Sequence, residues 1–131
     1  MNISNYYWYF SGVLTPKFCD EVIKYASAQK ESIARTCGYD KEGPEKGKIR
    51  KLSMTCQLTD GSEYKGGELE FDFRNYDPHM RDESKHRIQC KEILPKGSII
   101  VFPSFVWHRV KPVTSGTRYS LVVWNLGWPF N

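Results

Sequence analysis

From residue 49 onward, the chain consists of short runs in which apolar and polar residues alternate, separated by turns that contain glycine or proline. A period of two places successive side chains on opposite faces of a strand, so each run predicts a strand. About six or seven short strands at this spacing, preceded by one helix, predict a β-sandwich or a jelly-roll barrel. The runs are IRKLSMTCQL, ELEFDFR, IQCKEIL, GSIIVF, WHRVKPV and RYSLVVWNL.

A strand and a helix are predicted before these runs. The aromatic segment SNYYWYFSGVL predicts the strand, and TPKFCDEVIKYASAQ predicts the helix. Thr15 is a natural N-cap, and Pro16 suits the first helical position because its fixed φ matches the helix. Apolar residues at helical spacing predict a buried stripe that packs the helix on a sheet. The stripe comprises Phe18, Cys19, Val22, Ile23 and Ala26.

At 131 residues, the chain is predicted to be a single domain. Residues 1–35 form its N-terminal strand and helix, 36–48 a polar linker, and 49–131 the strands. The fold class is therefore mostly β, of the α+β type.

Charge and composition argue against several classes of function. The net charge of +4 arises from 19 basic and 15 acidic residues with one short basic cluster, so no nucleic-acid partner is expected. No signal peptide or long apolar run is present, which predicts a cytoplasmic protein without a membrane segment. The four cysteines form no CxxC and are expected to be reduced thiols.

The alternation also assigns residues to faces. In ELEFDFR, Leu69, Phe71 and Phe73 are expected to face the core, and Glu68, Glu70 and Asp72 to face outward. In IRKLSMTCQL, the apolar set is Leu52, Met54, Cys56 and Leu58. In the last strand, one face carries Arg118, Ser120, Val122 and Trp124, and the other carries Tyr119, Leu121 and Val123. Because both of its faces are largely apolar, the last strand is expected to be covered on each side.

Arg118 on such a face must bind an anion, because an unpaired buried guanidinium is energetically costly. A carboxylate suits its planar fork, and the Ser120 hydroxyl is placed to donate to the same group. The alternative is an ion pair with a protein carboxylate such as Glu68 or Glu70. His108 alone is more often a structural histidine than a metal ligand, and the other two histidines, in the polar loop 74–86, are expected at the surface.

The order YKGGELEF, LPKGSIIVFPS, WHRVKPV and GTRYSLVVW resembles the carboxy-terminal two-thirds of the Fe(II)/2-oxoglutarate-dependent oxygenases. The likeness covers residues 49–128 and is strongest to the prolyl-4-hydroxylase-like and PKHD-type hydroxylases of bacteria and phages. Its most specific element is a histidine followed, after nine residues, by Arg-x-Ser. The resemblance implies a double-stranded β-helix, or jelly roll, with a supporting helix.

The resemblance also implies residue roles. His108 matches the distal iron-binding histidine, Arg118 the residue that pairs with the far carboxylate of 2-oxoglutarate, and Ser120 the hydroxyl beside it. Val122 and Trp124 would line the same pocket. The implied activity uses Fe(II), 2-oxoglutarate and O₂ to hydroxylate a C–H bond of a proline-containing peptide or a small molecule. The loop 74–86 and the N-terminal aromatic residues would select that substrate.

Strand geometry restricts how His108 and Arg118 can cooperate. A plain hairpin about Ser115 and Gly116 would place them roughly 16 Å apart along the ribbon, too far for one five-carbon diacid. Their strands are therefore expected in two facing sheets, with Pro112 and the turn 114–117 forming the corner.

The chain departs from the family at the other two iron ligands. No His-x-Asp or His-x-Glu occurs in the sequence, and the linker 36–48 stands where the family has a longer segment with this motif. We interpret this as a natural or engineered deletion that leaves a partly truncated barrel. Substitute ligands would have to come from a partner chain or from carboxylates and a histidine elsewhere. Those candidates are Asp40, Glu42, Glu45, and His79 with Asp82.

Three hypotheses follow. The chain is a minimised oxygenase, a catalytically inactive jelly-roll module that retains an anion pocket around Arg118, or a generic β-sandwich interaction domain. The lost strands would expose a sheet edge, which favours a homodimer.

Overall fold

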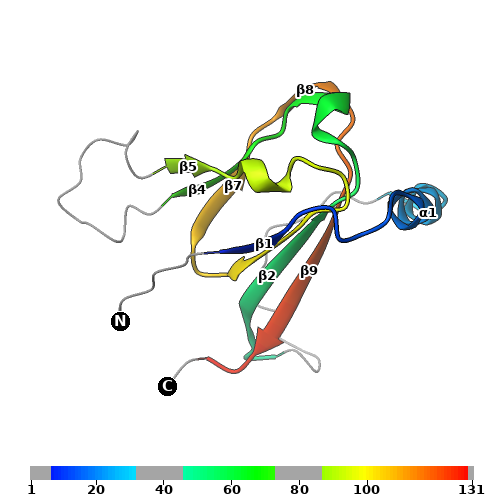
Figure 1. The fold of residues 1–131 in the computed structure, drawn as a ribbon. Coiled ribbons are helices and arrows are strands. Elements are labelled where there is room, and N and C mark those ends of the chain that lie inside the picture. The colour runs from blue at the N-terminus through cyan, green and yellow to red at the C-terminus, as the bar shows by residue number, and fades with distance from the viewer. Residues whose placement is uncertain (1–6, 32–45, 73–86, 130–131) are drawn as a thin grey trace.

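A computed structural model describes residues 7–31, 46–72 and 87–129 (Figure 1). Within these ranges the chain contains one α-helix, α1 (Pro16–Ser27), and nine strands. The strands are β1 (Trp8–Phe10), β2 (Ile49–Gln57), β3 (Tyr64–Gly66), β4 (Leu69–Asp72), β5 (Arg87–Gln89), β6 (Ile99–Pro103), β7 (Trp107–Val110), β8 (Val113–Gly116) and β9 (Ser120–Gly127). Two 3₁₀-helices, η1 (Gly61–Glu63) and η3 (Lys91–Ile93), complete the described elements. The predicted mostly β class with one helix is confirmed.

The strands form three antiparallel sheets. The largest has the order β1-β6-β2-β9, a second has the order β5-β4-β7, and β3 pairs with β8. Within the described residues these sheets do not close into a barrel. In Figure 1, β4, β5 and β7 lie on one side of the molecule, and β2 runs beside β9 on the other.

The core lies between the four-stranded and three-stranded sheets. Phe102 of β6 meets Phe71 of β4 edge to face, with 5.0 Å between ring centroids. Tyr7 stacks on Phe71 at 4.9 Å. The buried core cluster consists of Leu69, Phe71, Cys90, Ile93, Ile100, Phe102 and Val106. Leu69 and Phe71 face inward as predicted, whereas Phe73 lies outside the described residues.

The polar residues that alternate with the apolar set of β2 are the more consistently buried ones. Ser53, Thr55 and Gln57 are buried, although Cys56 is buried too and Leu52 is 42% exposed. The register explains the burial, because Ser53 pairs with Phe102 and Thr55 with Ile100. Directly paired residues share a face, so the polar row of β2 lines the core side. A polar row on a core face is a place where a polar ligand can bind.

Helix α1 begins as predicted, with the Thr15 hydroxyl accepting a hydrogen bond from the Phe18 amide at 3.2 Å. The predicted buried stripe is formed only in part, with Val22 and Ile23 half-buried. Cys19 is fully buried, but Phe18 is 44% exposed and Ala26 is exposed as well. Figure 1 shows α1 at one side of the molecule, and its buried Cys19 lies against the Gln57 carbonyl at the end of β2.

The prediction that β9 is covered on both sides is also wrong. Val122 and Trp124 on one face are 46% and 48% exposed, and Leu121 and Val123 on the other are similarly exposed. The physical reason is position, since β9 is an edge strand that pairs only with β2 among the described strands.

Cys19, Cys56 and Cys90 are free thiols in buried positions, as predicted, and Cys37 lies outside the described residues. Burial raises the pKa of the Cys90 thiol to about 12, which keeps it protonated at neutral pH. In the described part of the chain, no helix has the length and apolar character that crossing a bilayer requires.

Candidate functional site

The strands that carry His108 and Arg118 belong to different sheets. His108 lies on β7 in the three-stranded sheet, and Arg118 lies two residues before β9 of the four-stranded sheet. The prediction that the two strands do not form a simple hairpin is confirmed. The expected turn at 114–117 is largely wrong, because Val113–Gly116 forms strand β8, which pairs with β3 before the chain crosses to β9.

The register shows which way β9 faces. Ser120 pairs with Gln57, Val122 with Thr55 and Trp124 with Ser53. Those β2 residues share the core face with Ile100 and Phe102, as described above. Ser120, Val122 and Trp124 therefore lie on the inner face of the four-stranded sheet. Towards Trp124 this face is open to solvent, and the Arg50 guanidinium lies 3.3 Å from the centre of its ring.

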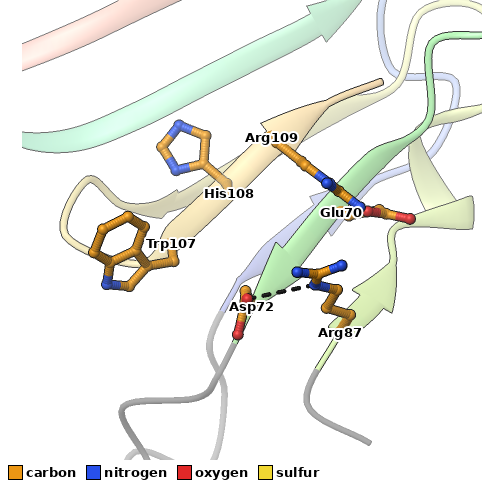
Figure 2. Close-up of a pocket in the computed structure, with 6 residues that line it drawn as sticks. All are labelled: Glu70, Asp72, Arg87, Trp107, His108 and Arg109. Carbon is orange, nitrogen blue, oxygen red and sulfur yellow. Dashed lines mark hydrogen bonds and ion pairs between the residues drawn. The ribbon is translucent and has the colours of Figure 1, made fainter. Parts of the chain in front are cut away.

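His108 occupies the inner face of the opposing sheet. It pairs with Phe71, and its ring meets that of Phe102 with 4.7 Å between centroids. Its Nδ1 is 2.7 Å from the Val106 carbonyl oxygen. Donation from Nδ1 to that carbonyl fixes the tautomer in which Nε2 is free to accept or to bind a metal. Figure 2 shows the imidazole on the opposite side of β7 from the Arg109 side chain.

Arg118 is partly buried and incompletely paired. Its Nη1 lies 3.4 Å from the Ser120 hydroxyl, a long hydrogen bond. Its Nε and Nη2 are buried and have no hydrogen-bond partner among the described residues. The neighbouring backbone is held firmly, because the Tyr119 amide donates to the Thr59 hydroxyl at 2.8 Å and the Leu58 amide to the Tyr119 carbonyl at 3.0 Å. The guanidinium thus has two buried donors without a partner among the described residues, which is energetically costly.

Two successive glycines form the turn that precedes β4, and the second of them lies against this arginine. Gly66 has φ +75, and a Cβ there would lie 2.3 Å from the Pro112 carbonyl oxygen. At Gly67, with φ +65, a Cβ would lie 3.1 Å from Arg118 Cδ and 3.3 Å from Tyr64 Cε2. The Gly-Gly pair thus serves a left-handed turn, and the missing side chain of Gly67 leaves room for Arg118 and Tyr64.

The alternative ion pair of Arg118 with Glu70 is not formed. Glu70 accepts from Arg109 Nε at 2.8 Å and lies 3.3 Å from Lys111 Nζ. The hydrogen bond from Arg109 lowers the pKa of the Glu70 carboxyl, and the hydrogen bond from Lys111 lowers it further. Glu70 therefore belongs to the outer face of the three-stranded sheet, away from Arg118.

A hollow of about 290 Å³ is lined mainly by residues of this outer face, with His108 also at its border, and Figure 2 shows these side chains. Glu70 and Asp72 alternate with the inward-facing Leu69 and Phe71, so the hollow is not the space between the two sheets. Its charged groups are paired across it, with Asp72 and Arg87 3.6 Å apart. The lining residues are Glu70, Asp72, Arg87, Trp107, His108 and Arg109.

The described residues do not complete an iron site. They contain no group of three or more His, Cys, Asp or Glu side chains arranged to hold a metal ion. The contact of His108 Nδ1 with the Val106 carbonyl leaves Nε2 free, but one imidazole does not bind Fe(II) usefully without further ligands. The candidate substitutes Asp40, Glu42, Glu45, His79 and Asp82 all lie outside the described residues.

Sequence reasoning missed two residues beside Arg118. Gln57, which pairs with Ser120, is fully buried, and its amide lies 2.6 Å from the Tyr64 hydroxyl. The signal that points to Gln57 is its place in the polar row of β2, which the sequence analysis did not assign to either face.

His108 and Arg118 thus belong to two different parts of a mostly β fold, His108 to the three-stranded sheet and Arg118 to the segment that leads into β9 of the four-stranded sheet. The family model of the 2OG-Fe(II) oxygenase superfamily matches residues 25–125. The chain belongs to this superfamily.

Curated relatives carry a more specific name. A PKHD-type hydroxylase of Synechococcus sp. (strain CC9605) is 33% identical over 97 residues, which is 72% of this chain and 38% of that protein. A PKHD-type hydroxylase of Synechococcus sp. (strain CC9902) is 39% identical over 75 residues, 57% of this chain and 28% of that protein. A PKHD-type hydroxylase of Hyphomonas neptunium is 40% identical over 73 residues, which is 56% of this chain and 27% of that protein. The matched part thus spans well under half of each relative.

Proposed function

We propose that this chain binds 2-oxoglutarate through Arg118 and Ser120 and acts in 2-oxoglutarate-dependent hydroxylation of the PKHD type. The observation that carries the proposal is the Arg118 guanidinium, whose buried Nε and Nη2 have no partner among the described residues. A carboxylate satisfies two such parallel donors at once. Membership of the superfamily supplies the identity of the acid, since its members use 2-oxoglutarate and Fe(II).

His108 is the residue that we propose for the metal. Its Nδ1 contact with the Val106 carbonyl leaves Nε2 available, as in many metal-binding histidines. Because the described residues supply no further ligands, His108 needs partners from the remaining residues of the chain or from another chain. O₂ is the second cosubstrate, and Val122 and Trp124 would line the open side of the site.

A second function is favoured by the missing His-x-Asp motif. A jelly-roll module that retains the carboxylate pocket but no iron would bind 2-oxoglutarate without turning it over. The two candidates share the Arg118 pocket and differ only at the metal. They can therefore be separated by measuring binding and turnover in the same samples.

The proposal is tested with purified protein titrated with 2-oxoglutarate, with and without Mn(II) or Fe(II). We expect saturating 2-oxoglutarate to stabilise the fold, by about 2.7 kcal/mol at one hundred times Kd. Arg118→Ala should lose this stabilisation. Arg109→Ala, which changes an arginine on the outer face, should keep it. Succinate formation that disappears in His108→Ala would identify the hydroxylase, whereas stabilisation without succinate would identify the binding module. No effect of 2-oxoglutarate on the wild-type protein would contradict both.

We further propose that the truncated jelly roll pairs through β9. This strand has eight residues, is bonded only to β2 within the described part of the chain, and exposes apolar side chains on both faces. Unpaired backbone groups on such an edge form strand pairs with another copy. The protein is therefore expected to elute as a dimer in size-exclusion chromatography with light scattering, and Leu121→Lys/Val123→Lys to elute as a monomer. A wild-type protein that remains monomeric at a protein concentration on the order of a millimolar would contradict this pairing.

A further inference from the structure

Gln57 is a buried amide with one unexplained end. It is the last residue of β2, its side chain is 0% exposed, and it faces the core side opposite Ser120. One end of its amide contacts the Tyr64 hydroxyl at 2.6 Å. The other end, placed as Oε1, has no hydrogen-bond partner among the described residues. A buried polar atom without a partner is destabilising, so this end is expected to meet a ligand.

The length of the contact with Tyr64 indicates which end of the amide faces the hydroxyl. Bonds between nitrogen and oxygen are usually 2.7–3.2 Å long, whereas bonds from a hydroxyl to an oxygen are usually 2.5–3.0 Å. A contact of 2.6 Å therefore suits Tyr64 donating to the Gln57 carbonyl oxygen. Half a turn of the amide exchanges its oxygen and nitrogen without moving other atoms. The NH₂ group then occupies the unpartnered end.

The unpartnered end belongs to the same cluster as Arg118. Gln57 is paired with Ser120, whose hydroxyl lies 3.4 Å from Arg118 Nη1. Tyr64 and Arg118 lie against the same side of Gly67, each within 3.3 Å of the point where a Cβ would stand. The four side chains of Gln57, Tyr64, Ser120 and Arg118 thus follow one another around one end of the β2–β9 pair. With the amide turned, the three unpartnered polar groups of this cluster are the Gln57 NH₂ and Arg118 Nε and Nη2, and all three are donors.

We propose that Gln57, oriented by Tyr64, is a further donor to the carboxylate that Arg118 binds. The inference rests on the proposed function, since it concerns the same pocket. Tyr64 acts as a positioning residue because it holds the Gln57 carbonyl and so turns the NH₂ group towards the ligand. A pocket that offers only donors selects an ionised carboxylate and disfavours an amide, whose own NH₂ would face donors.

The test measures binding to the metal-free protein by calorimetry, with 2-oxoglutarate and with 2-oxoglutaramate, the analogue that carries an amide at the far end. We expect the wild-type protein to prefer 2-oxoglutarate by at least about tenfold. Gln57→Met, which removes the donor at similar length, should weaken 2-oxoglutarate binding by about tenfold or more. Gln57→Glu, which keeps the shape and the Tyr64 contact but replaces the donor by a carboxylate, should weaken it by about a hundredfold or more.

Tyr64→Phe separates positioning from mere packing. In the wild-type background this variant should weaken 2-oxoglutarate binding several-fold and reduce the preference over the amide. In the Gln57→Met background it should add no further loss, because there is then no amide to orient. Ser53→Ala is the matched control, since Ser53 is a buried polar residue on the same face of β2 whose hydroxyl lies 2.8 Å from that of Ser104. Its binding should equal that of wild type.

The outcomes distinguish this inference from the proposed function. If Arg118→Ala abolishes binding while Gln57→Met, Gln57→Glu and Tyr64→Phe all bind as the wild-type protein does, the role of Gln57 is overturned and the 2-oxoglutarate pocket stands. Additive losses in the Tyr64→Phe/Gln57→Met double variant would overturn the positioning role. Absence of binding by the wild-type protein would overturn the proposed function, and the role of Gln57 with it.

Discussion

Arg118→Met is expected to raise the free energy of unfolding of the ligand-free protein by about 1–2 kcal/mol and to abolish stabilisation by 2-oxoglutarate. The two effects have one cause. Arg118 Nε and Nη2 are buried without a partner among the described residues. In the absence of ligand, the desolvation of these two donors lowers the free energy of unfolding. Methionine keeps much of the apolar stem beside Gly67 and removes the unpaired donors. Urea unfolding with and without 2-oxoglutarate measures both effects.

The same substitution at Arg109 is the control. Arg109 is an arginine with a partner, because its Nε donates to Glu70 at 2.8 Å, and its side chain is 52% exposed. Arg109→Met should lower the free energy of unfolding by no more than about 1 kcal/mol, the usual range for an exposed ion pair. It should leave the effect of 2-oxoglutarate unchanged. Destabilisation of the ligand-free protein by Arg118→Met would indicate that Arg118 has a structural partner, as the ion-pair alternative holds.

The sequence predicted strands well wherever an apolar period of two coincided with burial. In β4, Leu69 and Phe71 are inside because the outer face carries charged residues that water or ion pairs satisfy. The same reasoning did not identify the inner face of β2, where Ser53, Thr55 and Gln57 lie towards the core. Alternation tells that two faces differ, but not which face is inside when the interior holds a polar site.

Only the part of the candidate site that belongs to the sequence motif, namely His108, Arg118 and Ser120, could be predicted from the sequence. The spacing of His108, Arg118 and Ser120 led to the family and to the placement of two strands in different sheets, which the topology confirms. Their metal and cosubstrate roles stay predictions. The contact between Gln57 and Tyr64 could not be read from the sequence, because it joins the end of β2 to the start of β3 through side-chain geometry alone. The exposure of β9 also depends on tertiary context, namely which strand lies next to it.

The largest loss of stability is expected from Phe71→Ala, about 3–5 kcal/mol. Phe71 is 0% exposed, stacks on Tyr7 and meets Phe102 edge to face. Truncation to alanine removes apolar contacts on both sides and leaves a cavity between the two sheets. A domain of this size has a total stability of only about 5–15 kcal/mol, so the variant is expected to be partly unfolded at 37 °C. Urea unfolding followed by tryptophan fluorescence measures the change.

Phe105→Ala makes the same chemical change at a residue that is 63% exposed, and it should alter stability by no more than about 0.5 kcal/mol. The comparison also bears on the site. Phe71 pairs with His108, whose ring rests on Phe102, so the cavity removes the packing that holds the imidazole on the inner face. In the folded fraction of Phe71→Ala, the chemical shifts of the His108 ring should therefore change, whereas Phe105→Ala should leave them in place. Equal losses of stability in the two variants would mean that the core does not lie between these sheets.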